Sequence, residues 1–262
     1  MQKLNYINEG AKIADNVHVD YFTVIHEDVE IGEGTWIGSN VTIYPGARIG
    51  KNCKIFPGAV ISATPQDLKF DGEYTTVEIG DNCTIRECVT INRGTTDKQR
   101  TVIGKNCLIM AYCHVAHDCI LGDNVILANS VQLAGHVELG EHAFIGGTSA
   151  VHQFVKIGEH VMIGGGSLVR KDVPPFVTAA REPLSYIGLN TLGLRRRGFS
   201  NERIQTIQEI YRHLFLSGKN FSEGIEIVKN KVKDSIDREN ILNFFVHSKR
   251  GIIKKGNGEN IE

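Results

Sequence analysis

Residues 103–174 read IGKNCL IMAYCH VAHDCI LGDNVI LANSVQ LAGHVE LGEHAF IGGTSA VHQFVK IGEHVM IGGGSL VRKDVP, which are twelve consecutive blocks of six. Every block opens with Ile, Leu or Val, and every fifth residue is Cys, Val, Ala or Ser. A period of six is neither the 3.6 of an α-helix nor the 2 of a simple strand. It is typical of hexapeptide β-helix repeats, in which the first residue fills the core and Gly, Asn or Asp forms the corner.

The same pattern extends toward the N-terminus. Nine blocks run from Ile13 and three more from Ile79, with interruptions at 67–78 and 97–102. The 24 blocks predict eight three-sided coils and, at about 4.8 Å per coil, a prism roughly 40 Å long. Both interruptions are too polar for a core, so we expect them to project as loops near the functional site.

The repeat ends at Pro174–Pro175, and a helical period follows. Ser200 is the expected N-cap of a first helix, and Ser222 of a second. A third helix is expected over 241–246, and the tail from Gly256 is expected to fray. The fold class is therefore an all-β solenoid, a parallel β-helix of hexapeptide repeats over 1–183, with a small helical domain over 184–262.

The chain of 262 residues carries 29 Lys+Arg and 30 Asp+Glu, a net charge of −1. This balance argues against a nucleic-acid partner. The N-terminus has no apolar run of the kind found in signal peptides, and no stretch of 18 apolar residues predicts a transmembrane segment. We expect a soluble, cytoplasmic protein.

Five of the six cysteines occupy the small fifth position, which predicts buried filler rather than disulfides or a metal site. They are Cys53, Cys83, Cys107, Cys113 and Cys119. Cys88 falls on a fourth position, and its role is not predicted.

Histidines cluster in the repeat. His117, His136 and His152 belong to blocks that begin at 115, 133 and 151, which are eighteen residues, or one coil, apart. They are expected on one side of the prism in successive coils, with His114 and Asp118 beside them. The other six are expected at the surface, namely His18, His26, His142, His160, His213 and His247.

Three interpretations of this cluster are open. It is a solvated histidine ladder, a zinc site of the kind that carbonic anhydrases of this fold use, or an acid–base site. We favour acid–base catalysis, in which one imidazole removes a proton and Asp118 holds its tautomer.

The chain resembles one family over almost its whole length. The carrying motifs are HVAHDC, LAGHVELGEHAFIGG, AVHQF, VPPFV and NTLGLRRRGFS, with QDLK and RECVTINRGT near the two interruptions. They resemble the acyl-carrier-protein–UDP-N-acetylglucosamine O-acyltransferases, which begin lipid A synthesis. The resemblance implies a left-handed β-helix, a homotrimer with sites between subunits, and no metal or organic cofactor. An (R)-3-hydroxyacyl group would pass from acyl carrier protein to the 3-hydroxyl of UDP-N-acetylglucosamine.

The resemblance also implies roles for single residues. His117 matches the general base, Asp118 orients it, and the Gly135 N–H faces the oxyanion. Gly165 matches the position that sets acyl-chain length, and a glycine there implies a long chain. The expected substrate-binding residues are His114, His136, His152 and Gln153, then Asp67 and Lys69 from the neighbouring subunit, and Asn190, Arg196 and Arg197 for the nucleotide.

Two differences from the pattern of the family leave the identity of the acceptor sugar open. Asn92 stands where many relatives carry His, and Leu192 where some carry Glu. A 3-amino sugar nucleotide is therefore an alternative acceptor. The N-acyltransferase of the same pathway has an additional N-terminal domain, for which a repeat beginning at Ile13 leaves no room. The acidic helix of the carrier protein is expected to meet basic residues near a subunit interface.

Overall fold

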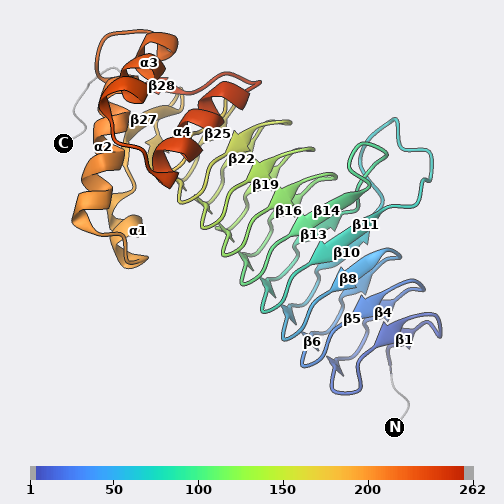
Figure 1. Cartoon of the computed structure of the whole chain (residues 1–262). Helices are drawn as coiled ribbons and strands as arrows, with labels where there is room; N and C mark the ends of the chain where they lie inside the picture. The colour runs from blue at the N-terminus through green and yellow to red at the C-terminus, as the bar shows by residue number, and fades with distance from the viewer. Residues whose placement is uncertain (1–3, 257–262) are drawn as a thin grey trace.

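The computed structural model describes residues 4–256, which form a three-sided β-helix with helices at its C-terminal end (Figure 1). Three sheets of nine, eight and eleven strands, here sheets A, B and C, run along the prism. Every strand pair is parallel except β26 with β27. The fold is a left-handed parallel β-helix with a small C-terminal helical region, as predicted.

Sheet A contains β1 (Tyr6–Ile7), β4 (Val24–Ile25), β7 (Thr42–Ile43), β10 (Val60–Ala63), β13 (Thr90–Asn92), β16 (His114–Val115), β19 (Gln132–Leu133), β22 (Ala150–Val151) and β25 (Leu168–Val169). Sheet B contains β2 (Lys12–Ile13), β5 (Glu30–Ile31), β8 (Ala47–Ile49), β11 (Thr76–Ile79), β14 (Arg100–Ile103), β17 (Ile120–Leu121), β20 (Glu138–Leu139) and β23 (Lys156–Ile157).

Sheet C contains β3 (His18–Val19), β6 (Trp36–Ile37), β9 (Lys54–Ile55), β12 (Thr84–Ile85), β15 (Leu108–Ile109), β18 (Ile126–Leu127), β21 (Phe144–Ile145), β24 (Met162–Ile163), β26 (Val177–Ala180), β27 (Ser185–Leu189) and β28 (Lys254–Lys255). We name the edges of the prism by the sheets that meet there: A–B, B–C and C–A.

The core follows from the block rule. The first residue of each block is the inward residue of a strand and stacks in register on its counterpart one coil away, as Val115 does on Leu133 and Leu133 on Val151. The fourth residue turns most corners with a positive φ, which Asn tolerates better than most residues, as at Asn106 (56°) and Asn124 (59°). The five fifth-position cysteines are buried and free, whereas Cys88 is exposed.

The β-helix is slightly longer than the predicted eight coils. It begins at Tyr6 instead of Ile13, because Ile7 opens one more block, INEGAK, that the prediction missed. Strands β1 to β24 make eight complete coils, and β25 and β26 continue into a ninth. In the ninth coil the sheet B strand is reduced to a single bridge between Ile157 and Val173.

The two loops project from the prism as expected, beside β11 and β14 (Figure 1). They span 64–75 and 93–99, so the predicted ranges 67–78 and 97–102 ended about three residues late. Strands β11 and β14 are four residues long and pair along their full length, with Val77 and Thr101 turned inward. The six-residue block pattern does not predict these longer strands, because their first residues lie outside any block.

The helical segment contains α1 (Thr191–Arg196), α2 (Asn201–Phe215), α3 (Phe221–Lys231) and α4 (Ile236–His247). Ser200 caps α2 as predicted. The expected cap of α3 was wrong, because Asn220 and not Ser222 accepts from the first turn. Helix α1 was not predicted, and α4 begins five residues before the expected 241.

Two boundary expectations concern the C-terminal segment. Strand β27 follows the predicted boundary at 183/184 and still extends sheet C, so that boundary stays a prediction. The tail expected to fray lies, apart from Gly256, outside the described residues. None of the helices within 4–256 combines the length and hydropathy needed to cross a bilayer.

Candidate active site

The A–B edge carries both loops and most of the predicted site. The loops 64–75 and 93–99 join sheet A to sheet B in two successive coils. The next three corners of this edge are 116–119, 134–137 and 152–155. The chain therefore places His117, His136 and His152 on one edge, directly beyond the two loops.

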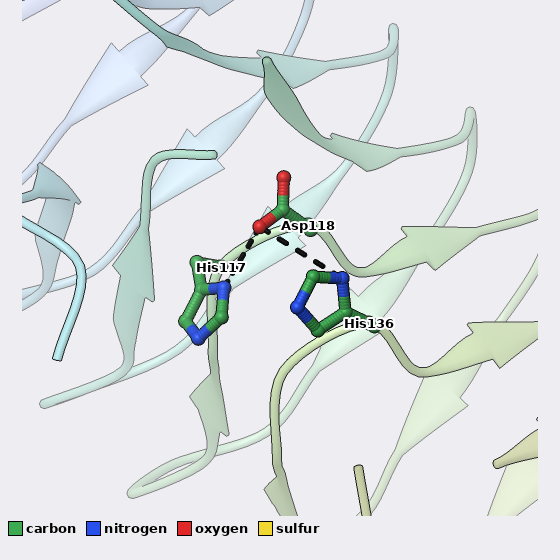
Figure 2. A group of neighbouring side chains, drawn as sticks. All are labelled: His117, Asp118 and His136. Atoms are coloured by element: carbon green, nitrogen blue, oxygen red, sulfur yellow. Dashed lines mark hydrogen bonds and ion pairs between the residues drawn. The ribbon is translucent and has the colours of Figure 1, made fainter. Parts of the chain in front are cut away.

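The centre of this edge is a histidine–carboxylate pair (Figure 2). His117 Nδ1 lies 2.8 Å from Asp118 Oδ2. An ionised carboxylate can only accept, so this contact puts the imidazole proton on Nδ1 and leaves Nε2 with its lone pair. Nε2 makes no hydrogen bond with any described residue, so it is free to accept a proton from a substrate.

Asp118 is fully buried and held by the second loop. Its carboxylate accepts from the Thr95 N–H at 3.0 and 3.2 Å, from the Thr95 hydroxyl at 2.6 Å and from the Lys98 N–H at 3.1 Å. Burial by itself raises the pKa of Asp118, but the hydrogen bonds from His117, Thr95 and Lys98 outweigh it and hold the pKa well below its usual range. The group is therefore an anion at neutral pH.

Gly135 lies against the His117 ring, one coil further along. A Cβ at this position would be 2.6 Å from His117 Cε1 and 2.7 Å from Nε2, so any side chain there would displace the ring. The Gly135 N–H donates to no group within 4–256. The free edge of the imidazole thus lies beside Gly135, whose backbone amide is also free.

His136 completes the group drawn in Figure 2. Its ring is perpendicular to that of His117 at 5.0 Å and stacks on Phe154 at 4.3 Å. Its Nδ1 lies 3.0 Å from an Asp97 carboxylate oxygen and 4.0 Å from Asp118, without the alignment of a hydrogen bond. Two carboxylates therefore face this second imidazole.

His117, His136 and Asp118 bring three possible metal ligands within 4.8 Å of one another. A zinc ion there would need lone pairs of Asp118 that already accept from three residues. This donor set fits a charge-holding carboxylate better than a metal ligand.

His114 and His152 lie on either side of this group. His114, on β16, has its Nδ1 2.7 Å from the Thr90 hydroxyl, and burial lowers its pKa, with a further contribution from His117. His152 Nδ1 lies 3.0 Å from Nη2 of Arg250, which can only donate. Gln153 follows it at the same corner and is exposed.

Asp67 and Lys69 lie in the first loop, at a corner two coils before that of His117. Asp67 accepts from the Lys69 N–H at 3.0 Å, which shapes the loop tip, and Lys69 is exposed. Asn92 is buried and donates to the Thr64 carbonyl at 3.1 Å, so it anchors the start of this loop. Within one chain this loop makes no hydrogen bond with His117 or Asp118.

The predicted nucleotide residues lie beyond the opposite border of sheet B. Asn190 caps α1 and donates to the His160 carbonyl at 2.9 Å. Arg197 donates to the His142 carbonyl at 3.3 Å, at the B–C edge. Its Nη1 is buried without a hydrogen-bond partner among the described residues. Arg196 and Leu192 of α1 are exposed.

His142 and His160, which were expected at the surface, are half-buried beneath aromatic rings. The two imidazole rings stack on each other at 4.9 Å, and His160 also stacks on Phe176 at 5.7 Å. Burial, followed by the charge of Arg197, lowers the pKa of His160 to about 4. The covering residues Phe176 and Phe199 come from beyond the regular repeat, so block phase did not show them.

Gly165 lies on the C–A edge and is exposed. The nearest atom to a Cβ built there is the Gly147 carbonyl oxygen, at 3.3 Å. A side chain at this position would therefore project over the outer surface, past Gly147.

Sequence reasoning missed the second-loop residues that hold Asp118, and also Arg250. Thr95 and Lys98 lie in a polar interruption next to the histidine corner, a position that could have marked them. Arg250 is 98 residues from His152 and carries no local signal.

A β-helix of six-residue repeats with a His–Asp pair at one edge defines a hexapeptide-repeat transferase. The model for bacterial hexapeptide transferases matches residues 28–63, 100–135 and 136–171. A second model, described as domain 2 of UDP-N-acetylglucosamine O-acyltransferase, matches residues 172–253.

Comparison with known proteins identifies one family within this class. The chain is 43% identical to the acyl-[acyl-carrier-protein]–UDP-N-acetylglucosamine O-acyltransferase of Thiobacillus denitrificans over 246 residues, 94% of this chain and 95% of that one. It is 50% identical to that of Chlorobaculum parvum over 193 residues, 73% of each. The solved UDP-N-acetylglucosamine acyltransferase of Bacteroides fragilis is 48% identical, with a TM-score of 0.95 over 97% of this chain and 100% of that one. The chain belongs to the acyl-[acyl-carrier-protein]–UDP-N-acetylglucosamine O-acyltransferase family.

Proposed function

We propose that this protein transfers an (R)-3-hydroxyacyl group from acyl carrier protein to the 3-hydroxyl of UDP-N-acetylglucosamine, the first step of lipid A biosynthesis. The observation that carries the mechanism is the orientation of His117. Its Nδ1 is fixed on Asp118 at 2.8 Å, while Nε2 is free and lies beside Gly135.

In the proposed reaction His117 Nε2 takes the proton of the sugar 3-hydroxyl as that oxygen attacks the thioester carbonyl carbon. The developing imidazolium is stabilised by the Asp118 anion, and the oxyanion accepts from the Gly135 N–H. When the tetrahedral intermediate collapses, the carbon–sulfur bond breaks and the leaving thiolate takes the proton back from His117. The products are the ester and the free thiol of the carrier protein.

We infer that the site is shared between subunits of a homotrimer. Asn190, Arg196 and Arg197 lie on the far side of sheet B from His117, and the first loop carries Asp67 and Lys69 away from the prism. A neighbouring copy is needed to bring these groups to one substrate. His114, His136, His152 and Gln153 would then contact the sugar from one subunit.

The proposed acyl groove passes Gly165, where the absence of a side chain leaves room for a long chain. The buried, unpartnered Nη1 of Arg197 supports diphosphate binding, because a planar guanidinium suits phosphate oxygens. We also propose a cytoplasmic location, where the acyl carrier protein and the sugar nucleotide would both be available.

The test is acyl transfer from a panel of (R)-3-hydroxyacyl carrier proteins, with His117→Ala assayed beside the wild type. Transfer that depends on His117 supports the reaction and the base. If no donor acylates UDP-N-acetylglucosamine, the acceptor is wrong, and the 3-amino sugar nucleotide is tried next.

Subunit sharing has its own test. His117→Ala and Lys69→Ala subunits are unfolded and refolded together, and the assembly mass is measured by light scattering. A shared site predicts recovered transfer in mixed trimers, because some interfaces receive both intact residues. Inactive mixtures, or a monomeric wild type, contradict the shared site.

A further inference from the structure

The second loop closes over Asp118 in a way that singles out one side chain. Four of the contacts to the carboxylate come from this loop, and three of them are made by two backbone N–H groups, which any residue would supply. The exception is the Thr95 hydroxyl, which donates to Oδ2 at 2.6 Å. This is the oxygen that also faces His117 Nδ1.

Thr95 is itself oriented and nearly buried, with 7% of its surface exposed. Its hydroxyl oxygen lies 3.4 Å from the Asp97 N–H, which donates to it and so directs the hydroxyl proton toward Asp118. A hydroxyl that accepts on one side and donates on the other has a single favourable rotamer. The direction of the Asp118 oxygen is thereby determined.

Contacts on both sides hold the second loop (93–99) in place. Glu73 of the first loop accepts from the Thr96 N–H at 3.1 Å. Lys98 Nζ pairs with Glu138 on sheet B at 2.8 Å, and Glu138 pairs with Lys156 at 2.8 Å. The loop therefore holds Thr95 against Asp118 in a fixed position rather than resting loosely on the surface.

We propose that Thr95 is a positioning residue, which acts through Asp118 to keep the His117 proton on Nδ1 and its Nε2 available as the base. The inference rests on the proposed function for its kinetic consequence, but the tautomer of His117 can be measured without any substrate. Without the hydroxyl, Oδ2 keeps only the longer contact with the Thr95 N–H at 3.2 Å and is held less firmly. His117 then gains access to the tautomer with its proton on Nε2, which cannot remove a proton there.

The variant is Thr95→Val, which keeps the shape of the side chain and removes the hydroxyl. We expect kcat to fall about tenfold to a hundredfold, part of the 10²–10⁴ that a positioned base supplies. KM for both substrates is expected to stay near the wild-type value, because Thr95 faces Asp118 and not the open edge. Thr95→Ser keeps the hydroxyl and is expected to restore most of kcat.

A matched control separates positioning from stability. Thr23 is also fully buried, and its hydroxyl donates to the Gly38 carbonyl at 2.8 Å, but it lies in the second coil, far from His117 in the solenoid. Thr23→Val removes an equivalent buried hydrogen bond, so it should lower Tm about as much as Thr95→Val and leave kcat unchanged.

The second measurement is the ¹⁵N spectrum of labelled histidine in the substrate-free protein. We expect one Nδ1–H tautomer of His117 in the wild type and in Thr95→Ser, and a mixture in Thr95→Val. Wild-type kcat together with an unchanged tautomer in Thr95→Val would overturn the inference. If no variant, wild type included, transfers an acyl group, the proposed function fails, and the tautomer ratio still decides the role of Thr95.

Discussion

His136 on the A–B edge and His160 on the B–C edge hold the same place in the repeat, yet their chemistry is opposite. Both are fourth residues of a block, both have positive φ (63° and 56°), and both stack on a phenylalanine of the next coil. His136 faces the carboxylates of Asp97 and Asp118, whereas His160 is half-buried near Arg197. The repeat sets the geometry of a corner, and the segments that cover the corner set its charge.

These covering segments differ in origin. The A–B edge is covered by two loops inserted into the repeat. The second loop brings hydrogen-bond donors to Asp118, and His117 Nε2 stays open. The B–C edge is covered by the C-terminal helical segment, which brings Phe199 and Arg197. An edge that leaves an imidazole nitrogen open to a substrate can perform acid–base chemistry, and an edge whose histidines are half-covered by aromatic rings contributes to packing.

The largest effect is expected from removing the imidazole of the open edge. His117→Ala should lower kcat/KM by about 10²–10⁴ while the fold and assembly remain. The matched control is His26→Ala, which alters a histidine beside the same edge that stacks on Tyr44 at 4.9 Å. Equal losses in both variants would show that His117 has no special role among the histidines of this edge.

The second prediction tests the close approach between Gly135 and the His117 ring. Gly135→Ala places a methyl group 2.6 Å from the His117 ring and should lower kcat by about tenfold to a hundredfold, because the base is displaced. Gly10→Ala is the control, since its Cβ meets no atom nearer than 3.3 Å. The measurement is kcat of the two variants under steady-state conditions. Wild-type kcat in Gly135→Ala would argue against the His117 ring as the base.

A third prediction extends the comparison to the C–A edge. Gly165→Met should reduce kcat/KM for the longest accepted acyl donor by about tenfold, which corresponds to a clash of 1–2 kcal/mol. Shorter donors should be affected little. Competition between donors of different length measures this ratio, and a uniform loss for all donors would mean that Gly165 lies outside the acyl path.

The smallest effect concerns stability at the B–C edge. The folded pKa of His160, about 4, lies below its ordinary 6.5, so the unfolded state binds more protons between these values. With respect to His160, the free energy of unfolding is therefore highest above pH 6.5 and decreases as the pH falls toward 4. Because His160 is partly exposed, we expect a loss on the order of 1 kcal/mol.

His160→Phe should remove this pH dependence, since Phe154 and Phe176 already occupy equivalent corners with φ of 64° and 65°. Urea unfolding at pH 7 and at pH 5 measures the difference between the variant and the wild type. An equal change in both proteins would show that other groups, and not His160, cause the acid sensitivity.

The block rule alone determined much of this protein. An aliphatic residue every six positions, with a small residue at each fifth position, predicted the solenoid, because these two residues of each block point inward. The eighteen-residue spacing of His117, His136 and His152 placed them on one side, because eighteen residues make one coil. The Ser200 cap was predictable because a cap uses only local atoms.

Only the tertiary structure decided what surrounds these positions. Thr95 reaches Asp118 across 23 residues, and Arg250 reaches His152 across 98, so neither contact has a period or a local signature. The burial of His160 depends on Phe176 and Phe199, which follow the last regular block. A repeat specifies its own corners because each coil rests on the next, but the protonation of a histidine depends on distant segments that fold against it.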